Sequence, residues 1–364
     1  MDPMSPERKE AKRRLLRDIV RHFVARTNHR LDEARQFERL VVDLFVVVGK
    51  ETIAEVAADL CRHPETPPGI LQRLFEEGGE ATRLALQFAP VLAPERLATT
   101  AETGAPEEAE ALAKRPDLSR DAVAALIARG DGQVFQALVG NRHLRLDAAT
   151  LRALTQLARD DAELARGLLD RGSPDVDREA LFLAATGDER AAIILNACRA
   201  AMLSGPYDAP VRDYSLAERL EAHALAHNYD ALIATIAAAL DARKISRVRR
   251  MVFDARGEPL ALLLVALSFN TERATRVLLV CGLPFSFDVT HVRALRALVA
   301  STPPRAATRL VAAMTGAQRA ERDPVRRPQT QEDANWAARN RRAAPRETSE
   351  IKSAREPGAS AGRV

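Results

Sequence analysis

Two histidines, His223 and His227, lie four residues apart in a stretch that predicts a helix. This spacing can place two imidazoles on one metal ion. The surrounding AHALAHNYD lacks the general-base glutamate of an HExxH motif and offers no third ligand, while Leu216 and Leu220 share the same helix face. We therefore predict that the two histidines lie at a helix contact, and we predict no metal and no other cofactor.

The chain also lacks the patterns that accompany nucleophilic catalysis. It contains no GxSxG, no glycine-rich phosphate loop and no cysteine with a convincing histidine partner. Cys61, Cys198 and Cys281 are far apart and form no CxxC pair, which favours free thiols in a reducing cytoplasm. We predict no catalytic residue and a protein that is not an enzyme.

A first group of basic residues lines one face of the first predicted helix, residues 6–27. Its members, four residues apart, are Lys9, Arg13, Arg17 and Arg21. The opposite face is predicted to be an apolar stripe of Leu15, Leu16, Ile19, Val20 and Phe23. The helix is therefore a basic amphipathic one, a type that binds acidic proteins or lies on anionic membrane surfaces. The alternative is a terminal helix that packs on the body with its basic face in water.

A second basic group spans the junction between two predicted helices. It consists of Arg243, Lys244, Arg247, Arg249 and Arg250. Such a concentration of cations suits phosphate or an acidic protein. The alternative is again a solvated helix face.

The single tryptophan, Trp336, lies near the C-terminus in TQEDANWAARNRR. Thr330 and Asp333 give a weak helix-capping pattern before it. A large aromatic side chain flanked by charges is typical of a short segment that folds against a partner. The alternative is an incidental residue.

The composition favours a helical core and locates the excess charge. Hydrophobic residues make up 46% and aromatic residues 4%, so the core consists of Leu, Val, Ile and Ala, and Leu and Ala also favour helices. The net charge is +4, and residues 317–364 hold 11 Lys/Arg and 7 Asp/Glu. Because the whole chain has 54 Lys/Arg and 50 Asp/Glu, residues 1–316 contain 43 basic and 43 acidic residues and have no net charge. A neutral body disfavours nucleic-acid binding.

The elements that would position these groups follow a repeat of about 26 residues. Leucines mark it most clearly: Leu60, Leu86, Leu112 and Leu138. Prolines recur at the same interval, at Pro64, Pro90 and Pro116. Glycines do so as well, and we predict that they end helices: Gly78, Gly104 and Gly130. Later units depart from this exact interval: Leu168 opens a fifth unit, and Leu195 is predicted to close it with its side chain in the core. A repeat of this length predicts an all-α fold, an α-solenoid of short helical hairpins that bury their apolar faces on one another.

The repeat sets the predicted domain organisation. Residues 1–59 form an N-terminal helical cap, 60–198 the repeat array, 199–316 a C-terminal helical domain and 317–364 a disordered basic tail. The linker SGPYDAPVRD, residues 204–213, interrupts the periodicity. The longest apolar stretches are about half the length that spans a bilayer, and the N-terminal residues are polar. We expect a soluble cytoplasmic protein without a transmembrane segment.

Several stretches resemble known families. PETPPGILQRLFEEGGEATRLAL looks like a leucine-rich-repeat-variant unit, a short helical repeat similar in style to HEAT arrays. LALQFAPVL, ALAKRPDLSRDAVAALIARGDGQVFQALVGN and LIATIAAAL with ISRVRRMVFDARGEPLALLLVAL resemble the bacterial domain-of-unknown-function family 2336, over roughly residues 35–315. The resemblance implies a helical fold and brings no activity or catalytic residue.

From architecture we predict a non-enzymatic scaffold or adaptor that binds protein partners on its helical-repeat surface. The alternative function is binding of nucleic acid or an anionic surface through the two basic groups and the tail. The neutral charge of residues 1–316 disfavours the nucleic-acid version.

Overall fold

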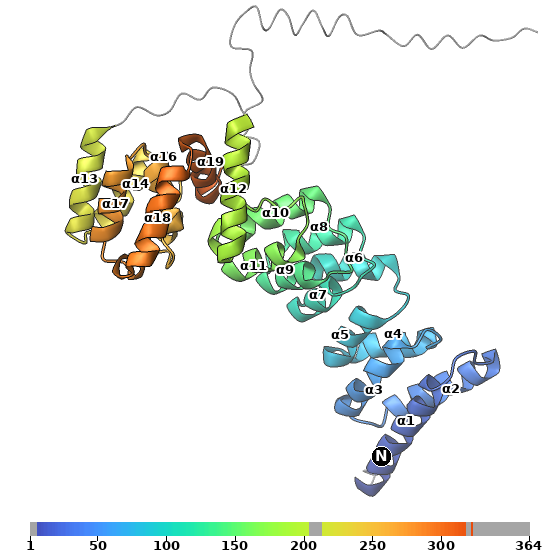
Figure 1. Cartoon of the computed structure of the whole chain (residues 1–364). Coiled ribbons are helices and arrows are strands. Elements are labelled where there is room, and N and C mark those ends of the chain that lie inside the picture. The colour runs from blue at the N-terminus through green and yellow to red at the C-terminus, as the bar shows by residue number, and fades with distance from the viewer. Residues whose placement is uncertain (1–5, 204–212, 318–321, 323–364) are drawn as a thin grey trace, which may run out of the picture. The chain divides into compact units, whose positions relative to one another are not determined.

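The fold is all-helical in the part of the chain that the structure describes. This computed structural model describes residues 6–203, 213–317 and 322, and within them every regular element is a helix (Figure 1). The chain divides into two compact units, residues 1–317 and 318–364, and the helices described here belong to the first. The predicted all-α class is therefore confirmed for these residues. Trp336, nearly all of the predicted tail and most of the predicted linker lie outside them.

Three helices precede the repeats: α1 (Pro6–Val24), α2 (Leu31–Phe45) and α3 (Lys50–Arg62). In α1, Leu16, Val20 and Phe23 recur at helical spacing and are buried with the apolar residues of α2 and α3 in one core cluster. Leu15, a member of the predicted apolar stripe, is largely exposed. Helix α1 thus packs against α2 and α3 through a narrower stripe than the sequence predicted.

Eight short helices follow in the region of the predicted repeats. They are α4 (Pro68–Glu77), α5 (Gly79–Phe88), α6 (Pro94–Thr103), α7 (Pro106–Ala113), α8 (Arg120–Ala128), α9 (Gly132–Gly140), α10 (Ala148–Ala158) and α11 (Ala162–Arg171). Proline begins α4, α6 and α7, where its missing N–H costs no hydrogen bond. Ser119 Oγ accepts a hydrogen bond from the backbone N of Ala122 at 3.1 Å and so caps the N-terminus of α8.

These helices pack as consecutive hairpins. Helix α4 contacts α5, α6 contacts α7, and α10 contacts α11. The second helices also stack on one another, α3 on α5, α5 on α7, α7 on α9 and α9 on α11, while α6 contacts α8. Each hairpin therefore buries its apolar faces against its neighbours in the chain.

The leucines of the 26-residue series occupy the core, with one exception. Leu60, Leu86, Leu112, Leu138 and Leu168 are buried. Leu195, predicted to close the fifth unit, is 50% exposed, so its core assignment is wrong. Helix α12 (Gly187–Leu203) buries Ile193 and Ala197 instead, and a residue midway between them lies on the opposite helix face.

Two of the predicted glycine stops require glycine's conformational freedom. Gly78 has φ 73° and Gly130 has φ 75°, a region that other residues rarely adopt. Gly104 ends α6 with φ −60° and needs no such freedom. A Cβ at Gly104 would lie 2.7 Å from the carbonyl oxygen of Thr100, so close approach explains this glycine.

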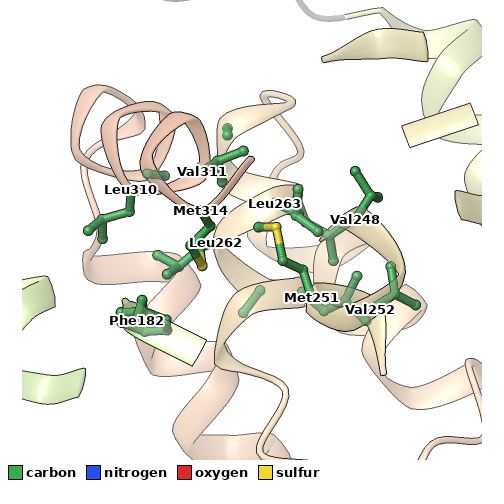
Figure 2. Close-up of a cluster of buried hydrophobic side chains, with 14 of the residues drawn as sticks. Phe182, Val248, Met251, Val252, Leu262, Leu263, Leu310, Val311 and Met314 are labelled. Carbon is green, nitrogen blue, oxygen red and sulfur yellow. The ribbon is translucent and has the colours of Figure 1, made fainter. Parts of the chain in front are cut away.

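The C-terminal helices begin after the 3-10 turn η1 (Phe182–Ala184). They are α12, α13 (Tyr214–Leu225), α14 (Tyr229–Ala239), α15 (Ile245–Val252), α16 (Glu258–Ala266), α17 (Thr271–Val280), the 3-10 turn η2 (Pro284–Phe287), α18 (Val289–Ser301) and α19 (Pro304–Thr315). Every residue of α16 from Pro259 to Ala266 is buried. Figure 2 shows Leu262 and Leu263 of α16 beside the side chains of α15 and α19.

One core cluster joins the last repeats to the C-terminal helices. It runs from Phe135 of α9 to Met314 of α19 and includes Phe182. The predicted boundary at residues 198 and 199 falls inside α12, which contacts α19. The division of residues 1–316 into three domains stays a prediction.

Candidate interaction sites

The first basic group lies on α1, where ion pairs hold part of it. Arg17 Nη2 lies 2.7 Å from Glu55 Oε2 of α3, and Arg13 Nη1 lies 3.4 Å from Glu10 Oε2. Lys9 is exposed, and Arg21, also exposed, has its Nη1 3.3 Å from Asp18 Oδ1. Since Leu16, Val20 and Phe23 of α1 are buried in one core cluster with α2 and α3, these apolar side chains are not available to a membrane surface in this arrangement. A binding role for the basic face stays a prediction.

A groove of about 510 Å³ lies between α1 and α2. Phe23 stacks on Phe37 with ring centroids 3.8 Å apart and on His29 at 3.9 Å, and Ile19 and Leu40 complete the apolar lining. The polar lining includes both acidic and basic side chains. This concave surface beside the basic face of α1 was not predicted, because it depends on how two helices pack.

Three members of the second basic group meet one carboxylate. Asp160 lies in the turn between α10 and α11, 84 residues before Lys244 in the chain. Its Oδ1 accepts hydrogen bonds from Arg247 Nε at 3.0 Å and Arg250 Nη2 at 2.8 Å. Its Oδ2 accepts from Arg247 Nη2 at 2.8 Å and Lys244 Nζ at 3.0 Å. We call these four residues the Asp160 cluster.

The cluster strongly favours the ionised form of its central acid. The hydrogen bond from Arg247 holds the pKa of Asp160 well below its usual range, and the hydrogen bond from Lys244 adds to the effect. Partial burial acts in the opposite direction and does not cancel the contribution of the cations. Asp160 is therefore a permanent anion at neutral pH.

The end of α19 is fixed beside the Asp160 cluster. Arg159 donates from Nη1 to the carbonyl oxygen of Gly316 at 2.5 Å and from Nη2 to that of Ala317 at 2.8 Å. Arg247 Nη1 donates to the carbonyl oxygen of Thr315 at 3.2 Å. Cations at a helix C-terminus satisfy carbonyls that lack helical partners and complement the helix dipole.

The remaining members of the second basic group lie apart from the cluster. Arg249 pairs with Asp230, Nη2 to Oδ1, at 2.5 Å, and Arg243 is exposed. The structure therefore brings together three of the five predicted residues. Sequence reasoning missed Asp160 and Arg159, because no local pattern connects the α10–α11 turn to α15.

His223 and His227 do not share a helix face. His223 lies within α13, whereas His227 follows the helix in a left-handed conformation, with φ 51°. His227 packs against Gly282, where a Cβ would lie 2.7 Å from its Cε1. Among the described residues, no three His, Cys, Asp or Glu side chains are grouped as metal ligands would be.

The described cysteines are free thiols. Burial raises the pKa of Cys61 to about 12. Burial also raises the pKa of Cys198, which is only half-buried. Both thiols are therefore protonated at neutral pH, and a protonated thiol is a poor nucleophile.

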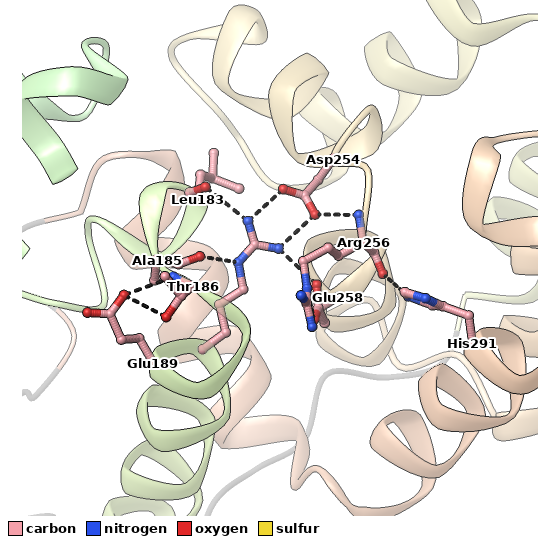
Figure 3. A network of polar contacts seen from close by, with 9 residues as sticks. Leu183, Ala185, Thr186, Glu189, Asp254, Arg256, Glu258 and His291 are labelled. Atoms are coloured by element: carbon pink, nitrogen blue, oxygen red, sulfur yellow. Dashed lines mark hydrogen bonds and ion pairs between the residues drawn. The ribbon is translucent and has the colours of Figure 1, made fainter.

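A buried ion network holds α12 to the α15–α16 turn (Figure 3). Arg190 Nη1 donates to Asp254 Oδ1 and Glu258 Oε2, and Nη2 donates to Asp254 Oδ2, each at 2.8 Å. Its Nη2 and Nε also donate to the carbonyl oxygens of Leu183 and Ala185. All five N–H groups are used, so this buried guanidinium is satisfied. No local pattern in the sequence indicates this network, because Arg190 lies 64 residues from Asp254 and 68 residues from Glu258.

Polar side chains also tie each repeat to the one before it. Arg115 Nη1 donates to the carbonyl oxygens of Leu86 and Ala89, each at 2.9 Å. One unit later, Asn141 Nδ2 donates to Ala113 at 3.1 Å and Arg115 at 2.7 Å. These carbonyls belong to the C-terminal ends of α5 and α7, which lack helical donors.

The pattern continues into the next unit. Arg171 Nη1 donates to the carbonyl oxygens of Val139 at 3.1 Å and Asn141 at 2.9 Å. We call Arg115, Asn141 and Arg171 the backbone clamp. The sequence held a signal for it, since Arg115 and Asn141 stand 26 residues apart, immediately before Pro116 and its equivalent. Polar residues in a repeated column are usually interpreted as surface, which is why it was missed.

These features define a protein whose described residues form an all-helical fold with buried polar networks and clusters of basic side chains. The chain belongs to a family described as "Uncharacterised protein conserved in bacteria", domain-of-unknown-function family 2336, whose model matches residues 83–312. This confirms the predicted family, over a shorter range than the predicted 35–315. No curated protein and no solved structure matched the chain. None of the described helices has the length and apolar character needed to cross a bilayer.

Proposed function

We propose that this protein is a non-enzymatic cytoplasmic scaffold that binds partner proteins within residues 60–198, on the exposed faces of the helices α4, α6 and α8. In this proposal those residues form an α-solenoid similar to leucine-rich-repeat-variant and HEAT-like arrays. Such arrays present an extended surface because each unit contacts mainly its neighbours.

One observation carries the proposal. Positions 26 residues apart on α4, α6 and α8 are all exposed, and α6 contacts α8. One set of equivalent positions is Gln72, Ala98 and Ala124, and another is Glu76, Glu102 and Ala128. A surface that recurs at a fixed step suits an extended partner that contacts several units. The small alanine side chains leave room for a partner to approach the helices closely.

The experiment changes this surface without changing the core. The double variant Ala98→Glu, Ala124→Glu adds two charges at exposed positions and leaves the buried apolar side chains intact. We expect the variant to lose partners that cross-linking and affinity capture recover with the native chain. Ala234→Glu, at an exposed position of α14, is the matched control. Identical partners for all three proteins would contradict the proposal.

A second candidate function is binding of nucleic acid, which the cations of the Asp160 cluster favour and the neutral charge of residues 1–316 disfavours. Fluorescence anisotropy with a DNA duplex at about 50 and about 200 mM salt tests it. A phosphate-backbone complex loses affinity steeply over this range. Binding that is absent, or that does not depend on salt, excludes this candidate.

A further inference from the structure

The Asp160 cluster carries more positive charge than its own acid balances. Lys244, Arg247 and Arg250 share one carboxylate, so two positive charges remain within the cluster. Arg159, the residue before Asp160, is fixed at the end of α19 by the carbonyl oxygens of Gly316 and Ala317. A compact group of cations around one acid attracts a further anion.

The cluster is both accessible and fixed in place. The side chains of Lys244 and Arg250 are 57% and 38% exposed, whereas that of Arg247 is 8% exposed. Arg247 is held by Asp160 and by the carbonyl oxygen of Thr315. Arg250 Nη2 is held by the carbonyl oxygen of Arg159 at 2.5 Å and by Asp160. A ligand would therefore find its donors already oriented.

Donor atoms remain for such a ligand. Among the residues that the structure describes, Lys244 uses one of its three N–H groups and Arg250 bonds only through Nη2. The other N–H groups of Lys244, together with Nε and Nη1 of Arg250, provide several donors on the exposed side. A phosphate monoester offers three acceptor oxygens and nearly two negative charges at neutral pH.

We propose that the Asp160 cluster is a recognition site for a phosphorylated segment of a partner protein, which binds beside Asp160 through Lys244 and Arg250. The phosphate dianion matches the two uncompensated charges, whereas a single carboxylate neutralises only one. This inference rests on the proposed scaffold function and identifies the chemistry of one partner.

The first test measures binding of a phosphoserine probe to the full chain. N-acetyl-phosphoserine amide and its unphosphorylated form are titrated by calorimetry and by phosphorus NMR. We expect the phosphorylated probe to bind and its unphosphorylated form not to bind. The double variant Lys244→Gln, Arg250→Gln should bind the phosphorylated probe about tenfold more weakly or worse. Arg249→Gln, on the exposed side of the same helix and paired elsewhere, is the control and should leave the affinity unchanged. Equal affinity for the native chain and the double variant overturns the proposal.

Single substitutions keep the test valid if the double variant does not fold. Lys244→Gln changes an exposed side chain and should weaken the probe severalfold while circular dichroism stays native. Asp160→Asn removes the competing carboxylate and should strengthen binding about tenfold. An unchanged affinity in both single variants overturns the proposal.

Two further outcomes separate the alternatives. A single-stranded oligonucleotide without a terminal phosphate that outcompetes the probe at the same residues would assign the cluster to nucleic acid and overturn the proposal. Loss of phosphoserine binding in Lys244→Gln while captured partners still depend on Ala98 and Ala124 would place phosphate recognition apart from the array surface. Phosphoserine binding that persists when the array variants lose no partner would refute the scaffold surface alone.

Discussion

At the residue scale, the buried charges of this protein hold helices together. Arg190 is paired with Asp254 and Glu258 in the fold interior, where the side chain of Arg190 is 5% exposed. Removing the shared cation of such a buried network leaves charge in the interior that is no longer balanced. The Asp160 cluster differs, because two of its cations face solvent and its charges do not balance.

The first prediction concerns Arg190. Arg190→Met should lower the free energy of unfolding by about 3–5 kcal/mol, because Asp254 and Glu258 lose their shared cation in a nearly dry site. Arg199→Met, at an exposed position of the same helix, should change it by less than about 0.5 kcal/mol. Urea unfolding followed by circular dichroism measures both. Similar values for the two variants would show that the network contributes little.

The second prediction concerns pH. The hydrogen bond from Arg166 is the main reason that the pKa of Glu189 falls from 4.5 to about 2, and contacts with Thr186 add to it. Because the folded pKa is lower, the unfolded chain binds more protons in this range, so the stability contributed above pH 4.5 is lost as the pH falls toward 2. The neutral amide of Glu189→Gln does not titrate, so this variant lacks the pH-dependent stability that the Glu189 carboxylate contributes.

Unfolding experiments at pH 7 and at about pH 3 check this expectation. The native chain should be more stable than Glu189→Gln at pH 7, and the difference should shrink at the lower pH. A difference that stays constant across the two values would show that the carboxylate is not the group responsible.

At the element scale, the short helices depend on polar as well as apolar contacts with their neighbours. Helices of eight to eleven residues are marginal alone, and packing gives them most of their stability. In residues 60–171 the apolar columns bury leucines, and the backbone clamp supplies donors to helix ends one unit earlier. The C-terminal ends of α5, α7 and α9 are therefore completed by a donor from the next unit.

The third prediction tests the backbone clamp. Asn141→Ala should cost about 1–3 kcal/mol, because the buried carbonyls of Ala113 and Arg115 lose their donor. Arg142→Ala alters the exposed neighbouring residue and should change stability by less than about 0.5 kcal/mol. Thermal and urea unfolding measure both variants. Equal stabilities of Asn141→Ala and Arg142→Ala would show that the backbone clamp does not stabilise the packing of the repeats.

At the scale of the whole molecule, the sequence predicted the helices better than the contacts between distant segments. The periodicity of leucine, proline and glycine predicted the helical hairpins and the buried column up to Leu168. It was wrong at Leu195, where the repeat had drifted and a different face of α12 is buried. The Asp160 cluster and the Arg190 network join residues more than 60 positions apart. Such contacts depend on the folded chain and leave no local pattern.

The fourth prediction concerns the C-terminal residues. If the segment around Trp336 folds on a partner, Trp336→Ala and deletion of residues 318–364 should remove the same protein from affinity capture. Gln331→Ala is the control within the same segment. The folded unit of residues 1–317 should keep its thermal midpoint in every case. Recovery of all partners from both altered chains would refute the role of Trp336.

The backbone clamp also bears on how chains of this kind change length. Arg115, Asn141 and Arg171 each donate hydrogen bonds to the unit directly before their own. A duplicated unit would therefore include the side chain that binds it to its predecessor. A gene that copied residues 116–141 in tandem should encode a chain with one more folded hairpin, whereas an insertion of half a unit would misalign both the leucines and the clamp. Growth by whole units is thus the genetic change that this packing tolerates best.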